Sequence, residues 1–130
     1  MKIRFLLDEN LSTKLKIAVL RLNPAIDILR VGDSDAPPLG TLDPDILRYL
    51  ELSQRLLVTD NRKSIPGHLE EHWADGGHIW GLLWLRPSGT LSTWAKEMYL
   101  IWETSEAEEW LDKIEPKLRL KILILDCFFC

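Results

Sequence analysis

The feature that most constrains this chain is the alternation of short apolar runs with segments whose apolar residues recur at helical spacing. The apolar runs are nearly continuous, which is typical of parallel strands buried on both faces. Such strands are joined by crossover helices, so the order predicts a single α/β domain with a mostly parallel sheet of four or five strands and helices on both faces. The predicted strands are 2–7, 25–31, 55–59 and 78–85, with a possible fifth at 118–126, and the predicted helices are 11–22, 43–53, 67–74, 91–103 and 105–114.

Length, charge and cysteine usage narrow the class of protein. The 130 residues, 46% of them hydrophobic, suit one domain spanning 1–130. The formal net charge of −4 argues against sequence-independent coating of DNA, which needs many cationic contacts to phosphate. Neither a signal-peptide pattern nor an apolar run of about 20 residues is found, so we expect a cytoplasmic protein that is not membrane-bound. The only cysteines, Cys127 and Cys130, do not make a disulfide framework.

Acidic and amide side chains follow two of the predicted strands. Asp8, Glu9 and Asn10 come directly after the first strand, and Asp60 and Asn61 follow the third. An acid placed directly after a buried strand is costly unless it faces a partner. In an open parallel sheet, ligands bind outside the carboxyl ends of the strands, so we expect these groups to meet at one edge.

Asp43, at the start of the second predicted helix, completes a set of three carboxylates with Asp8 and Asp60. Three acids at one edge repel one another unless a cation lies between them, and oxygen ligands suit Mg²⁺ or Mn²⁺. Purely structural interpretations are also open. Asp43 before Pro44 is typical of an ordinary helix N-cap, and Asp60 with Asn61 is typical of a turn.

The stretch FLLDENLSTKLKIAVL, followed later by LDPDILRYLELSQRLLVTDNRKS, resembles the small PIN-like domains of bacteria over roughly the first 85 residues. These domains are compact relatives of the PIN nucleases and serve as toxins in toxin–antitoxin pairs. In this resemblance Asp8 matches the first acid, and Asp43 matches the acid that opens the helix before the third strand. The third family position falls at Asn61 or, with a slip of one residue, at Asp60.

The resemblance implies a divalent-metal-dependent ribonuclease, a hydrolase acting on phosphodiester bonds, with an RNA substrate and a cognate antitoxin. Mg²⁺ or Mn²⁺ would be bound by Asp8, Asp43 and Asp60 and would orient a water for in-line attack. The supporting and substrate-binding residues would be Glu9, Asn10, Asn61, Arg62 and Lys63.

Two alternatives to an active ribonuclease remain open. The acid that larger PIN nucleases carry in a helical insertion has no match here, so the chain could instead be a catalytically inactive PIN-like scaffold that binds protein or RNA. A phosphotransfer receiver also places acids at strand ends. It needs a lysine at the end of a late strand, where this chain has Leu85, Arg86 and Pro87.

The C-terminal tail, residues 118–130, is the most apolar part of the chain and reads LRLKILILDCFFC. A β-prone run with almost no charge is an aggregation hazard if its edge is exposed. We therefore expect the tail to be paired, either in the sheet of its own chain or across a homodimer.

Overall fold

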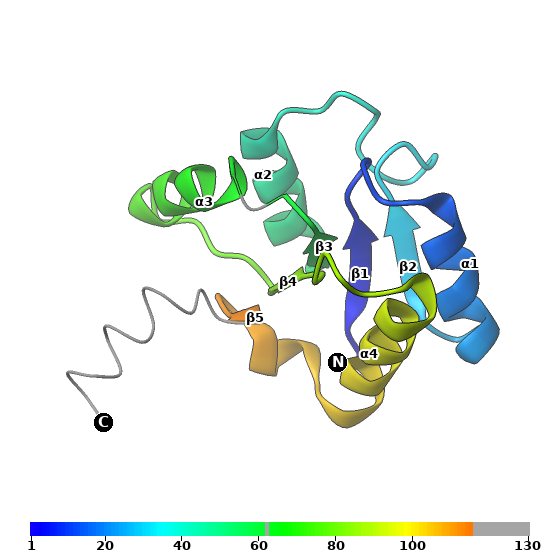
Figure 1. The fold of residues 1–130 in the computed structure, drawn as a ribbon. Helices are drawn as coiled ribbons and strands as arrows, with labels where there is room; N and C mark the ends of the chain where they lie inside the picture. The colour runs from blue at the N-terminus through cyan, green and yellow to red at the C-terminus, as the bar shows by residue number, and fades with distance from the viewer. Residues whose placement is uncertain (62, 116–130) are drawn as a thin grey trace.

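The computed structural model describes residues 1–61 and 63–115, along which strands and helices alternate (Figure 1). This arrangement confirms the predicted α/β class. In these residues no helix has the length and apolar character needed to cross a membrane. The strands are β1 (Arg4–Leu7), β2 (Asp27–Arg30), β3 (Leu56–Thr59), β4 (Leu82–Trp84) and β5 (Ile114–Glu115). The helices are α1 (Thr13–Leu22), α2 (Asp43–Ser53), α3 (Ile65–Ala74) and α4 (Leu91–Thr104), with a 3₁₀ helix, η1 (Ala107–Trp110), before β5.

The five strands form one sheet in the order β2-β1-β3-β4-β5, and every neighbouring pair is parallel. The strands β1 and β3 therefore lie side by side near the middle of the sheet. Because all strands run in the same direction, their C-terminal ends open onto one edge (Figure 1). We call this edge the C-terminal edge of the sheet.

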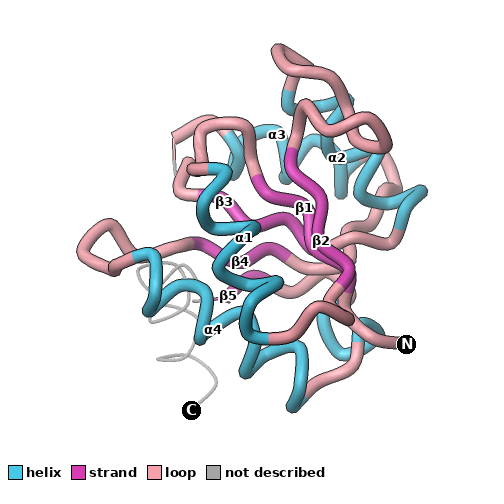
Figure 2. The backbone as a smooth tube through the Cα atoms, turned by 90° about the vertical axis from the view of Figure 1, so that its right-hand side faces the viewer, coloured by secondary structure: helices cyan, strands magenta, loops and turns pink. Residues whose placement is uncertain are grey.

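Both faces of the sheet are covered by helices, which explains why the strands are apolar throughout. Phe5 and Leu7 of β1 pack on one face with α1 and α4, whereas Leu6 packs on the other face with α2 and α3. The pleat of β3 repeats this alternation with Val58 and Leu57. The two helix pairs lie on opposite sides of the sheet in Figure 1, and α1 is nearest the viewer in Figure 2.

The helix starts have different causes. Ser12 caps α1, because its side chain accepts a hydrogen bond from the N–H of Lys14 at 3.1 Å. In α2 the N-cap residue is Leu42, and no side chain makes a capping hydrogen bond. The interpretation of Asp43 as an N-cap is therefore wrong, since Asp43 is the first residue of the helix and its carboxylate is available to partners outside it.

The segment 105–114 differs most from its prediction as a helix. After the short η1, Asp112 has a φ of 57°, a left-handed conformation that ends helical structure. The N–H of Asp112 donates to the carbonyl of Ile79 at 2.8 Å, and the N–H of Leu82 donates to the carbonyl of Lys113 at 2.9 Å. Backbone pairing with the β4 segment thus overrides helix propensity and makes β5. The strand predicted at 118–126 and the whole tail lie outside the described residues.

The predicted strand 78–85 contracts to β4 because Gly81 interrupts it. Gly81 has a φ of 110°, and a Cβ atom there would lie 2.9 Å from the Cβ of Trp110. Only glycine adopts this conformation readily and leaves room for the Trp110 side chain. The helix before β4, α3, begins at Ile65, two residues before the predicted start at 67.

Candidate functional site

The strand register brings the ends of β1 and β3 together at the C-terminal edge. Leu7 is paired with Val58, and the N–H of Asp8 donates to the carbonyl of Val58 at 3.0 Å. The residues that follow, Asp8 and Thr59, are therefore neighbours across the two strands. Asp8 is half-buried, whereas Thr59 has no exposed surface.

Two donors from the protein hold the carboxylate of Asp8. The hydroxyl of Thr59 donates to Oδ2 at 2.9 Å, and the N–H of Glu9 donates to Oδ1 at 2.8 Å. Burial raises the pKa of Asp8 above its ordinary value, and the negative charges of Asp60 and Asp43 raise it further. The two hydrogen bonds oppose this rise but do not cancel it. Asp8 is thus a carboxylate that two hydrogen bonds fix in place and whose pKa is raised mainly by burial.

A chain of hydrogen bonds connects Asp8 to Asp43 across the edge. The N–H of Asn61 donates to the Thr59 hydroxyl oxygen at 3.0 Å, and the side-chain amide of Asn61 donates to Oγ of Ser64 at 2.8 Å. The hydroxyl of Ser64 then donates to Oδ2 of Asp43 at 2.9 Å. We call these five residues, Asp8, Thr59, Asn61, Ser64 and Asp43, the acid-edge network, and we call the part of the C-terminal edge that carries them the acid edge. It is built from the ends of β1 and β3 and the starts of α2 and α3.

Asn61 acts mainly as an organiser of this network. Its side-chain oxygen accepts hydrogen bonds from the N–H groups of Lys63 and Ser64, at 3.2 and 3.3 Å. This is the Asx-type turn that the alternative interpretation of the sequence foresaw. The turn leads the chain into α3 and places the Ser64 hydroxyl opposite Asp43.

The other predicted site residues lie around the network in different roles. Asp60 is exposed, yet it is close enough for its charge to raise the pKa of Asp8. Glu9 accepts a hydrogen bond from the N–H of Gly40 at 3.1 Å through Oε1, which ties the loop before α2 to the edge. Asn10 and Lys63 are exposed. Arg62 lies outside the described residues.

Sequence reasoning missed His68 and Arg30. Nε2 of His68 lies 3.8 Å from Oδ2 of Asp43, next to the Ser64 hydroxyl. Ser64 and His68 are four residues apart, so their spacing indicates that they share one side of the start of α3, but it does not indicate that Asp43 lies opposite them. Arg30, at the end of β2, donates from Nε to the carbonyl of Leu11 at 2.9 Å and from Nη2 to the carbonyl of Glu9. It thereby fixes the loop that follows Asp8.

The chemistry of the edge suits a divalent cation. Its carboxylate oxygens are the ligands that Mg²⁺ and Mn²⁺ prefer, and the negative charges of Asp60 and Asp43 act on Asp8 and add to the rise in its pKa. Across residues 1–61 and 63–115, no three His, Cys, Asp or Glu side chains form a ready-made metal-binding group. The edge therefore matches a divalent cation in the type of its donor atoms and in its negative charge.

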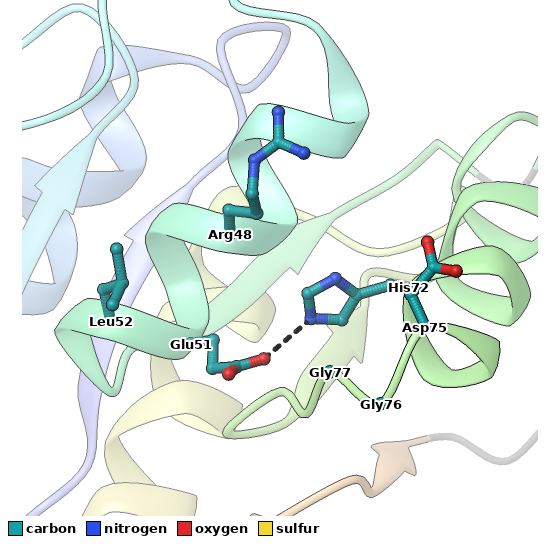
Figure 3. A pocket seen from close by; sticks show the side chains of 7 residues that line it. All are labelled: Arg48, Glu51, Leu52, His72, Asp75, Gly76 and Gly77. Atoms are coloured by element: carbon teal, nitrogen blue, oxygen red, sulfur yellow. Dashed lines mark hydrogen bonds and ion pairs between the residues drawn. The ribbon is translucent and has the colours of Figure 1, made fainter.

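A second polar cluster lies at the opposite edge of the sheet, beside a pocket of about 360 Å³ between α2 and α3 (Figure 3). The imidazole of His72 points at Glu51, with 3.0 Å between Nε2 and Oε1. Nδ1 of His78 lies 2.6 Å from Oδ2 of Asp112, and this hydrogen bond raises the pKa of His78. His72 and His68, although four residues apart on α3, thus face different partners. The second cluster fastens the connection between α3 and β4.

Comparisons with protein-family models, with curated proteins and with solved structures each gave no match. The role of the acid-edge network is therefore inferred from its own residues: their positions at the strand ends, their hydrogen bonds and their charge.

Proposed function

We propose that this protein is a divalent-metal-dependent ribonuclease of the PIN-like type. The observation that supports this best is the acid-edge network, in which Asp8 and Asp43 are held at the C-terminal edge of a parallel sheet. This is the edge at which open α/β sheets bind ligands. The raised pKa of Asp8, caused by burial and by the neighbouring acids, is the electrostatic signature of a site that gains from a cation.

In this proposal each residue has a defined task. Asp8 and Asp43 hold Mg²⁺ or Mn²⁺, and Asp60 adds a third carboxylate from the exposed side. The Thr59 hydroxyl and the Glu9 N–H keep the Asp8 carboxylate in one orientation. When bound, the cation supplies positive charge that offsets the charge developing on the phosphodiester. Lys63, exposed next to the network, contacts the phosphate of the RNA.

The test is cleavage of single-stranded RNA in the presence of Mn²⁺ by the wild type and by Asp8→Asn. The substitution keeps the size of the side chain but removes its charge, so we expect cleavage to be lost while the fold is retained. Asp75→Asn is the matched control because Asp75 is an exposed aspartate at the other end of α3. Equal cleavage by Asp8→Asn and the wild type would rule out the acid edge as the source of activity.

The resemblance to toxin-type domains extends the proposal to a toxin that is neutralised by an antitoxin protein. Induced expression of the wild type in a bacterial host should then arrest growth, and expression of Asp8→Asn should not. Growth arrest that persists with Asp8→Asn would separate toxicity from the acid edge.

The second candidate is a PIN-like scaffold without catalysis that binds protein or RNA. One observation favours it: Ser64 occupies Oδ2 of Asp43 and also accepts from Asn61, so protein groups already satisfy part of the acid edge. Replacing Ser64 by alanine discriminates between the two functions. In a metal site the substitution frees Asp43 and changes metal affinity, whereas in a scaffold it only lowers stability.

In this proposal the protein acts in the cytoplasm and forms a homodimer through the apolar tail at 118–130. The physical reason is the burial of apolar side chains, each of which gains roughly 1.5–3 kcal/mol when removed from water. Light scattering on the full chain and on a chain ending at residue 119 tests this point. A monomeric full-length protein and an equally stable shortened chain would refute it.

A further inference from the structure

A pocket of about 560 Å³ lies against the N-terminal half of α4, beside the loop that follows β4. Thr59 is paired with Trp84 in the sheet, and the N–H of Leu85 donates to the carbonyl of Thr59 at 3.0 Å. The next residue, Arg86, therefore leaves the same C-terminal edge, one strand away from Asp60. Arg86 also lines the pocket, so the pocket adjoins the acid edge.

One wall of the pocket is the indole of Trp94, which the loop holds in a fixed position. Its N–H donates to the carbonyl of Arg86 at 3.1 Å. On the same side, the backbone of Gly89 packs against the ring so closely that a Cβ atom there would lie 2.1 Å from Nε1. The half-buried ring is thus a preformed aromatic surface that needs no ordering when a ligand binds.

The charges on the pocket differ from those on the acid edge. Arg86 and Lys96 supply two cations against the single carboxylate of Glu97, whereas the neighbouring edge carries Asp8 and Asp60. The hydroxyl-bearing side chains of the pocket are Ser88, Thr90 and Thr93. Local positive charge next to an aromatic ring is the combination by which proteins bind single-stranded nucleic acid.

We propose that this pocket binds one nucleotide of a single-stranded RNA, next to the nucleotide whose phosphodiester lies at the acid edge. The base stacks on Trp94, and Arg86 and Lys96 contact the flanking phosphates. The inference rests on the proposed ribonuclease function, because it assigns the substrate path of that same site. It also gives a preference for unpaired RNA, since a base within a duplex cannot stack on a side chain.

The test measures binding of a short fluorescein-labelled 2′-O-methyl oligoribonucleotide by fluorescence anisotropy in EDTA, where metal-dependent cleavage cannot occur. We expect Trp94→Leu to raise Kd by roughly five- to 150-fold, the range found for single base–aromatic stacks. Trp94→Phe should restore most of the affinity. Arg86→Ala should raise Kd and lower the slope of log Kd against log salt by about 0.7, the value for one phosphate contact to a single strand.

Arg21→Ala is the matched control, because it removes the same charge from an exposed arginine in the last turn of α1, away from the C-terminal edge. Arg21→Ala should bind as the wild type does. Wild-type affinity in either Trp94→Leu or Arg86→Ala would overturn the inference. So would a duplex of the same sequence that binds as tightly as the single strand. Should Trp94→Leu fail to fold, Arg86→Ala alone decides, because its side chain is exposed.

Cleavage assays on the same proteins separate this inference from the proposed function. A wild type that cleaves RNA, with Arg86→Ala binding as the wild type does, overturns the pocket and leaves the ribonuclease. RNA binding that depends on Arg86 and Trp94 in a protein that never cleaves supports the pocket and removes the ribonuclease.

Discussion

Replacing Thr59 by valine tests the hydrogen bonds on which the acid edge depends. Valine has nearly the shape of threonine, so the buried volume is kept while the hydroxyl is lost. The hydroxyl donates to Asp8 at 2.9 Å and accepts from the N–H of Asn61 at 3.0 Å. A hydrogen bond to a charged group contributes about 1.5–3 kcal/mol to stability, and a neutral one about 0.5–1.5 kcal/mol. Because Asp8 is half-buried, water can replace part of the lost hydrogen bond. We therefore expect Thr59→Val to lower the free energy of unfolding by the lower end of the sum, about 2 kcal/mol.

The assay is urea unfolding at pH 7, followed by the fluorescence of the six tryptophans. Thr59→Ser is the control: it keeps the hydroxyl and loses one buried methyl group, which costs about 1 kcal/mol. We expect the order of stability to be wild type, then Thr59→Ser, then Thr59→Val. The loss in Thr59→Val should shrink in acid, because a protonated Asp8 no longer needs a donor. Thr59→Val as stable as Thr59→Ser at pH 7 would refute the reasoning.

Three further outcomes follow from the structure. Without divalent cations, Asp8→Asn should be more stable than the wild type at pH 7, as measured by urea titration. The folded pKa of Asp8 lies above its unfolded value of about 3.9, so the charged carboxylate lowers the stability of the wild type at pH 7. The difference in stability between the two proteins should close as the pH falls through the folded pKa towards the unfolded value. The hydrogen bond to Asp112 raises the pKa of His78, so the contribution of this bond to stability is complete below about pH 6.5 and is lost as the pH rises through the folded pKa. The pH profile of thermal unfolding of His78→Gln should lack this loss. Gly81→Ala should cost about 2–5 kcal/mol in urea unfolding, because its φ of 110° is strained for alanine and the new methyl meets Trp110; a loss below 1 kcal/mol, on the order of an ordinary surface change, would show that the loop relaxes.

The strand ends were predictable from the sequence because they depend on local pattern. Continuous apolar runs separated by helical segments indicate parallel strands, and a parallel sheet must place residues that follow its strands, such as Asp8 and Asp60, at one edge. The structure has Asp8 and Asp43 at that edge, joined through Thr59, Asn61 and Ser64.

The partners of these side chains were not predictable in the same way. That Thr59 donates to Asp8 depends on the register between β1 and β3, and that Ser64 donates to Asp43 depends on how α2 packs beside α3. Neither relation is written in the spacing of residues along the chain. His68 was missed for the same reason, since its only described acidic neighbour at the site, Asp43, is 25 positions away in sequence but 3.8 Å away in space.

The error at 105–114 has a different origin. Its residues have reasonable helix propensity, but propensity is a weak preference that tertiary contacts override. Here the left-handed Asp112 accepts hydrogen bonds from the indole N–H of Trp73, at 2.8 Å, and from the N–H of Ile79, at 2.9 Å. These long-range bonds hold the chain in a turn that leads into β5.

Calorimetric titration of Mn²⁺ into the wild type, Asp8→Asn and Asp75→Asn tests most directly whether the acid edge is a metal site. We expect the wild type and Asp75→Asn to bind Mn²⁺ with the same affinity and stoichiometry. Asp8→Asn should show no saturable heat, because it lacks the carboxylate that Thr59 and the Glu9 N–H hold in place. Saturable binding of equal affinity in Asp8→Asn, or none in the wild type, would contradict a metal-dependent function at this edge.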